Sequence, residues 1–360
     1  MIRHSLPHLI TRSEYKTEWS EWSPDPVPHV TAKWGERIML PNPVEIKHNN
    51  FYWYETELLD QIARDNAVIY LKYGYFLWQI DELKQSLAKV NEPRIVVSFC
   101  DLPGPWPDNV RLINTEPMAY QFSKAITRAG LRPKYQRRVS QLDHRFTIMA
   151  MGRDQGRHKL MLMLERLNLL ANAKHSNPDL APEQGVFTED HLAFNKMARP
   201  LPARILGDAY VKFNVEQNLK VLPGIIEQGN FFVSIDTNPF LDDRISNITE
   251  KIMWSMTTTT PVIPIWATNK ARQMAEWGFR FDNVGYRRSE ETEQQAVQRW
   301  CERIMFMDRI AQDPEWAQSF EDRSGEDTAH NVDLAKRLHV IIDQSIQHQI
   351  DQLPREFQDL

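Results

Sequence analysis

Phe231-Phe232-Val233-Ser234-Ile235 is an almost uninterrupted apolar run, and Pro261-Val262-Ile263-Pro264-Ile265 is a second one. Between them, Asn247-Ile248-Thr249-Glu250-Lys251 opens a predicted helix over 247–257. Strands that are apolar throughout and separated by amphipathic helices are typical of a parallel sheet with both faces covered. This stretch therefore predicts an α/β fold.

The same alternation of helix and strand begins near residue 51. Helices are predicted at 53–64, 77–90 and 117–129, with strands at 67–71, 94–99 and 111–113. A second set has strands at 145–150, 231–235 and 261–265, and helices at 153–171, 247–257 and 269–277. Thr268 is the expected N-cap of the last helix, and Gly278 the residue after its end. Two such sets predict two Rossmann-like domains, with a boundary near 135–143.

The C-terminal third is predicted to be helical. Residues 290–311 and 331–353 are amphipathic, and the polar segment 312–330 between them is predicted to be a loop. Because an apolar stripe must be buried somewhere, these helices are expected to pack back across the two domains or to join copies of the chain. The predicted organisation is an acceptor-side domain over 1–138, a donor domain over 139–290 and a helical extension over 291–360.

Length, composition and cysteine count limit the class of protein. A chain of 360 residues with 42% apolar and 25% charged residues has the composition of a soluble two-domain protein. No apolar run reaches the roughly 18–20 residues that span a bilayer, and the N-terminus lacks the apolar core of a secretory signal. Cys100 and Cys301 are the only cysteines, which excludes a disulfide framework or a Cys-rich zinc site. We expect a cytoplasmic protein (in the host cytoplasm if the chain is viral) without a membrane span.

The charge is unevenly distributed along the chain. The net charge of −5 argues against a general nucleic-acid binder, but residues 124–159 carry ten Lys or Arg and two Asp, a net +8 that leaves −13 elsewhere. A basic segment in an acidic protein indicates a localised anion site, and a solvated basic helix face is the alternative. Arg153 and Arg157 lie one helical turn apart in this segment, near a predicted helix start. Two guanidiniums there suit a diphosphate, although solvent-exposed arginines would give the same pattern.

The sequence lacks the motifs of several common nucleotide-binding, hydrolase and metal sites. No two glycines are spaced as Gly-x-Gly, and the chain contains neither a Walker A sequence nor a Gly-x-Ser-x-Gly elbow. The Asp-x-Asp metal motif is missing, and the histidines show no metal-binding spacing. A nucleotide ligand would therefore be held without a Gly-rich phosphate loop and without an obligatory metal or other cofactor.

Thr249, Glu250 and Lys251 place a carboxylate and an ammonium together at the start of a predicted helix. That arrangement can hold a ribose hydroxyl and a phosphate at once. The alternative is structural, because Asn247 as N-cap with Glu250 three residues later has the spacing of a capping box.

Taken in order, these motifs resemble a family. The order is Arg-Phe-Thr at 145–147, Arg157 with Leu160–Leu170, His175-Ser176, Phe232-Val233-Ser234-Ile235-Asp236, Ile248-Thr249-Glu250-Lys251, Pro261-Val262-Ile263-Pro264 and Trp277-Gly278-Phe279-Arg280-Phe281. This order resembles the C-terminal donor domain of fucosyltransferase-like GT-B glycosyltransferases, especially the divergent forms in phages and large viruses. The resemblance covers roughly residues 143–285.

The resemblance implies roles for individual residues. The helix with Thr249, Glu250 and Lys251 would hold the nucleotide sugar, with Glu250 at the ribose and Lys251 at the phosphates. Arg157, and less directly Arg153, would bind the diphosphate. Asp236 stands where the relatives often carry Glu and is assigned to the donor site with them.

The implied function is a GT-B glycosyltransferase that moves a sugar from a nucleotide-diphosphate donor to a hydroxyl acceptor, either a glycan or a hydroxymethylated pyrimidine of phage DNA. The fold implied is α/β, with two Rossmann-like domains facing a cleft and the C-terminal helices packed across them. The contrasting class is a non-catalytic binding or assembly protein that retains the GT-B fold.

An acceptor hydroxyl needs a base, which is usually Asp, Glu or His. Asp101 follows the predicted strand 94–99 at the carboxyl end, where α/β sites open, and is the candidate catalytic residue. A turn-forming Asp before Leu102-Pro103-Gly104 is the alternative reading. Asp81, Glu82 and Glu116 are rivals that the sequence does not rank.

Overall fold

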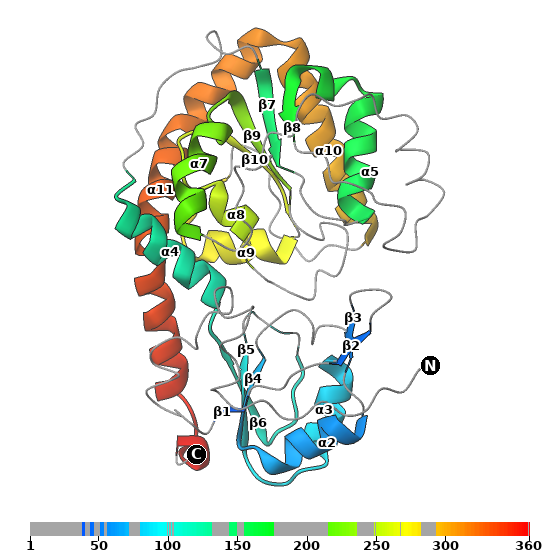
Figure 1. Cartoon of the computed structure of the whole chain (residues 1–360), viewed down its shortest axis with the longest axis vertical. Helices are drawn as coiled ribbons and strands as arrows, with labels where there is room; N and C mark the ends of the chain where they lie inside the picture. Colours follow the sequence, from blue (N-terminus) through cyan, green and yellow to red (C-terminus); the bar gives the residue numbers. More distant parts are fainter. Residues whose placement is uncertain are drawn as a thin grey trace. The chain divides into compact units, whose positions relative to one another are not determined.

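Figure 1 shows the computed structural model of the chain. It describes residues 38–39, 44–46, 51–53, 56–71, 80–98, 100, 102, 104–131, 144–149, 155–175, 215–235, 248, 250–266, 268–281, 293–358 and 360. The structure is mixed α/β with parallel sheets, as predicted. The chain forms two compact units, one of Met1–Gln121 with Val340–Leu360 and one of Phe122–His339. The C-terminal third of the chain contributes to both units.

The first unit contains a four-stranded sheet in the order β1-β4-β5-β6, with every neighbouring pair parallel. Its strands are β1 (Ile38–Met39), β4 (Val68–Leu71), β5 (Arg94–Ser98) and β6 (Val110–Asn114), and β2 (Val44–Ile46) pairs antiparallel with β3 (Phe51–Trp53). Helix α2 (Thr56–Asp65) packs against α3 (Ile80–Ala88). A bond of 2.7 Å from Lys89 Nζ to Asp60 Oδ1 ties this helix pair together, and this bond holds the pKa of Asp60 below its usual value.

The C-terminal segment covers the edge strand β6. Gln349, on the long helix α11 (Pro314–Asp351), accepts a hydrogen bond of 2.9 Å from the Asn114 N–H and donates one of 3.2 Å to the Asn114 carbonyl. The Phe357 ring of α12 (Arg355–Gln358) lies 4.7 Å from the Arg111 guanidinium. The Gln349 carboxamide thus makes the two backbone bonds that a further strand would make, which protects this edge from pairing with another chain.

The second unit contains a four-stranded sheet in the order β10-β9-β7-β8, again parallel throughout. The strands are β7 (His144–Met149), β8 (Ala173–His175), β9 (Gly229–Ile235) and β10 (Val262–Ile265). The helices between them are α5 (Gln155–Arg166), α7 (Val215–Ile226) and α8 (Glu250–Trp254). Because parallel crossovers are right-handed, a reversal of direction in the sheet moves the helices to the other face. Figure 1 shows α5 on one side of the sheet and α7 and α8 on the other.

The remaining helices are α4 (Pro117–Ala129), α9 (Thr268–Glu276) and α10 (Glu293–Gln312). The predicted end of α9 is confirmed. Gly278 has φ 96°, its N–H bonds the Ala275 carbonyl at 2.9 Å, and the Phe279 N–H reaches back to Met274 O at 3.0 Å. This is a Schellman end, in which a residue with positive φ lets the chain turn back and satisfy the last carbonyls.

The predicted loop over 312–330 is wrong, because α11 runs through almost all of it. Its start is fixed by Asp313, whose Oδ1 accepts the Trp316 N–H at 2.9 Å, and by Pro314 as the first helical residue. Phe320 is buried and forms an edge-to-face pair with Phe306. Glu321, Ser324 and Thr328 are buried as well, so tertiary packing buries polar residues that the sequence pattern assigns to a loop.

The predicted helix over 153–171 is also shorter than expected. Asn168 has φ 57°, a left-handed conformation that ends the helical segment, and a short 3-10 helix, η4 (Leu169–Asn172), follows it. Leu167 therefore leaves the apolar face on which it was placed and is 47% exposed. The chain then continues into β8, a strand that the sequence did not predict.

Gly278→Ala is expected to destabilise the second unit by about 1–2 kcal/mol, because a side chain disfavours positive φ. Gly224→Ala is the matched control. Gly224 lies inside α7 with no atom within 4 Å of an added Cβ, so alanine there should stabilise by about 0.5–1 kcal/mol. Urea unfolding measures both changes, and equal effects of the two variants would contradict the assigned backbone conformation.

Gln349→Ala is expected to destabilise the first unit by about 1–2 kcal/mol, because two backbone groups of β6 lose their partner. Gln347→Ala is the control on the same helix, since its exposed amide bonds Asp351 alone, and it should change stability by less than about 0.5 kcal/mol. Thermal unfolding of the two variants tests the difference, and a neutral Gln349→Ala would exclude the edge-capping role.

Candidate functional site

The carboxyl edge of the second sheet has the topology of a ligand site. From β7 the chain moves outward to β8, and it then returns across β7 to form β9 on the other side. The connections that leave β7 and β9 therefore run in opposite directions, although the two strands pair directly, with Met149 opposite Ser234 near their ends. In open α/β sheets, a crevice that binds ligands lies outside the carboxyl ends of two such strands.

The predicted donor residues follow these two strands in the chain. Arg157 is the third residue of α5, which follows β7. Glu250 and Lys251 are the first two residues of α8, which follows β9. In a parallel sheet the helix after a strand begins at the carboxyl edge, so both helices begin at the edge of the topological reversal. The side chains of these three residues lie outside what the structure describes, as do Arg153, Asp236 and Thr249 altogether.

Helix α8 contains only five residues, Glu250–Trp254. Asn247, the predicted N-cap of a capping box with Glu250, lies outside the described residues, as does Thr249. The five described residues of α8 contribute little dipole, so any anion near α8 would depend on side-chain charge.

Burial and hydrogen bonds hold the carboxyl end of α8 in place. Ile252, Met253 and Trp254 are at most 2% exposed. The Ser255 hydroxyl donates to the Ile252 carbonyl, and Thr257 Oγ1 donates to the Trp254 carbonyl at 2.7 Å. The same two carbonyls also accept the backbone N–H groups of Ser255 at 3.1 Å and Thr257 at 3.2 Å, so each hydroxyl bond reinforces a backbone bond at the end of the helix. The end of α8 opposite to Glu250 is therefore firmly anchored.

Buried polar side chains lie at the ends of the neighbouring strands. The Trp266 indole, directly after β10, donates to Ser234 Oγ on β9 at 2.9 Å. His175, the last residue of β8, is 2% exposed. The sequence motif had included His175, but only the pairing of β8 with β7 places it at this edge. These groups give the carboxyl edge a polar floor in an otherwise apolar sheet.

The first unit shows a different carboxyl edge. Its described strands follow one another in a single direction, without the reversal of the second sheet. The candidate base Asp101 lies outside the described residues. Asp81 and Glu82 are in the first turn of α3, whereas Glu116 follows β6 with φ 40° and is 3% exposed. Among the three described carboxylates, Glu116 combines burial with a strained backbone, which is a frequent feature of functional sites.

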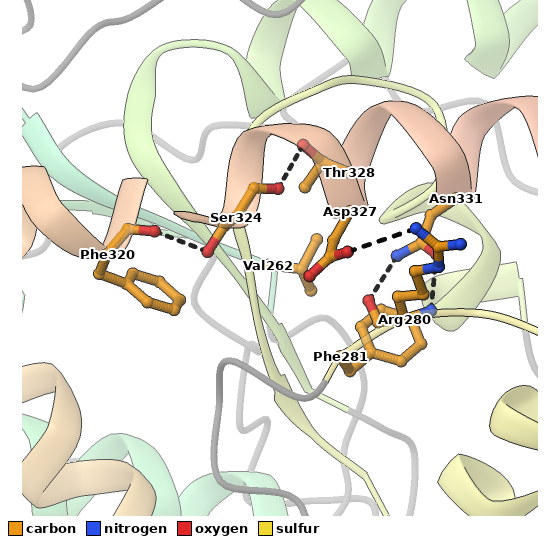
Figure 2. A pocket seen from close by; sticks show the side chains of 8 residues that line it. All are labelled: Val262, Arg280, Phe281, Phe320, Ser324, Asp327, Thr328 and Asn331. Carbon is orange, nitrogen blue, oxygen red and sulfur yellow. Dashed lines mark hydrogen bonds and ion pairs between the residues drawn. The ribbon is translucent and has the colours of Figure 1, made fainter. Parts of the chain in front are cut away.

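A hollow lies at the other end of the second sheet. Figure 2 shows it between α11 and the start of β10, lined by Val262, Arg280, Phe281, Phe320, Ser324, Asp327, Thr328 and Asn331. Arg280 Nη1 lies 3.9 Å from Asp327 Oδ1, so the charges at the hollow face each other. Its empty space, which includes the part open to solvent, is about 270 Å³. Its place at the amino end of β10 argues against a nucleotide site.

Among the described residues, no group of three or more His, Cys, Asp or Glu side chains gathers as a metal site. No described helix is long and apolar enough to cross a bilayer.

Comparison with known proteins adds no relative. No family model, curated protein or solved structure matches the chain.

Proposed function

We propose that the chain is a GT-B glycosyltransferase that transfers a sugar from a nucleotide-diphosphate donor to a hydroxyl acceptor. One observation carries the proposal. Helices α5 and α8, which carry Arg157, Glu250 and Lys251 in their first turns, follow β7 and β9, the two strands that flank the reversal in the second sheet. Open α/β sheets bind ligands beside such a reversal, which supports the proposal.

The proposed chemistry needs positive charge where the donor leaves. As the glycosidic bond breaks, negative charge grows on the departing diphosphate. Lys251, Arg157 and Arg153 would stabilise it, and Glu250 would accept hydrogen bonds from the ribose hydroxyls. Asp236, directly after β9, is assigned to the same donor site. A site of this kind uses side-chain cations in place of the Gly-rich loop that the sequence lacks.

The acceptor half of the reaction is proposed for the first unit. Asp101 stays the predicted base, because it follows β5 at the carboxyl edge of that sheet. The acceptor is a glycan or a hydroxymethylated pyrimidine of DNA. The net +8 of residues 124–159 suits DNA, whereas the −13 of the remaining chain disfavours extensive contact with a duplex.

A thermal-shift series with UDP-glucose, GDP-fucose, dTDP-glucose and CMP-sialic acid tests the donor site. A ligand that binds the native state at 100 times its Kd stabilises it by about 2.7 kcal/mol, which corresponds to a rise of roughly 5–10 °C in Tm. We expect this rise with at least one diphosphate donor. CMP-sialic acid carries a single phosphate and serves as the control that should give no rise. A series without any response would refute the proposed function.

Glu250→Gln and Lys251→Met are each expected to weaken binding of the best donor about 10- to 150-fold, because each variant loses one charge-assisted hydrogen bond. Glu276→Gln and Lys220→Met, at exposed positions of α9 and α7, are the matched controls and should leave the Kd within about twofold. Titration calorimetry measures all four. A non-catalytic protein that only retains the fold predicts no difference between the two pairs of variants.

A further inference from the structure

An aromatic contact joins α4 to the carboxyl end of α8. The ring centroids of Phe122 and Trp254 are 4.5 Å apart, with an angle of 78° between the rings. Both side chains are 2% exposed. This is the edge-to-face geometry that adds to the stabilisation from burial alone. Trp254 is one turn from Glu250 and Lys251 on a helix of five residues.

The contact with the Phe122 ring restrains the orientation of the Trp254 indole. Trp254 Nε1 is buried and finds no hydrogen-bond partner within the described structure. The indole is therefore oriented by packing, with Phe122 as its aromatic neighbour. Because short helices have little stability of their own, the direction of α8 depends on this packing.

Helix α4 is itself held in place on α11. The His339 N–H donates to Ser123 Oγ at 2.9 Å, and Ser123 Oγ also lies 2.9 Å from His339 Nδ1. One turn further along α4, Thr127 Oγ1 donates to the Lys336 carbonyl at 2.7 Å. Ser123 is fully buried, so the residue next to Phe122 is fixed. A chain of contacts thus runs from α11 through α4 to α8.

We propose that Phe122 is a positioning residue for the nucleotide-sugar site. Its contact with Trp254 sets the direction of α8. The direction of α8 in turn determines how Glu250 and Lys251 are placed relative to the bound donor. The inference rests on the proposed glycosyltransferase function. It extends that function to a residue of α4 that contacts no substrate and lies far from α8 in the sequence.

Substitutions of the aromatic pair test this role. Phe122→Leu and Trp254→Leu are expected to weaken binding of the best nucleotide sugar by about tenfold or more, because small displacements of binding groups are costly. Trp254→Phe keeps a ring for Phe122 to contact and loses no hydrogen bond, so its Kd should stay within about threefold of wild type. The control is Phe320→Leu, which removes an equally buried ring with its own edge-to-face partner, Phe306, and should also stay within threefold.

Titration calorimetry well below every Tm separates positioning from general destabilisation. Hydrogen exchange of the unliganded variants provides a second readout, in which amides of residues 250–256 should exchange faster in Phe122→Leu and not in Phe320→Leu. Wild-type affinity in Phe122→Leu, or equal weakening in Phe320→Leu, would overturn the positioning role. A wild-type protein that binds none of the three diphosphate donors would instead overturn the proposed function, together with this inference.

Discussion

The parallel pairing of β7 with β9 is the interaction on which the functional argument depends. It brings together two segments that are distant in the sequence and creates the reversal of direction in the second sheet. Both strands are largely buried, and Phe146 and Phe231, which lie opposite each other in the register, have ring centroids 6.4 Å apart. The pairing also requires a close backbone approach, because a Cβ on Gly229 would lie 2.6 Å from the Thr147 nitrogen. Glycine is the residue that permits this approach.

Helix α11 contributes in the same way to each unit, through a side-chain amide that bonds both backbone groups of a single residue. In the second unit, Asn331 Oδ1 accepts the Arg280 N–H and Asn331 Nδ2 donates to the Arg280 carbonyl, each at 2.8 Å. In the first unit, Gln349 does the same at Asn114. A carboxamide offers a donor and an acceptor at the spacing of a peptide group, so it completes segments that have no further strand beside them. One helix is thereby part of two folded units.

The sequence predicts those parts of the fold whose signals are local. Strands such as β5 and β9 are largely apolar because they are buried along their length, and the glycine after α9 marks a backbone turn that other residues resist. The errors arise where tertiary packing decides. The first turns of α11 bury Glu321 and Ser324 together with Phe320, so burial there does not follow the apolar pattern of the sequence. Strand β8 is three residues long and forms because β7 offers an edge. For the candidate site, the sequence predicts residue types and their order, while the order of the strands that precede these residues follows from long-range pairing.

A phosphate site at this edge would work differently from one built on a Gly-rich loop. Such a loop presents backbone N–H groups, which are fixed dipoles and keep their orientation without help from side chains. Here the helix after β9 is five residues long, and the sequence lacks closely spaced glycines, so the charge must come from long side chains. A flexible cation binds a diphosphate with less loss of entropy when its own helix is already held in place. The buried ring of Trp254, the hydroxyl bonds of Ser255 and Thr257, and the contact with α4 all restrain the carboxyl end of α8. A phosphate site whose affinity came from side chains rather than from backbone N–H groups would need this kind of restraint on the helix that carries them.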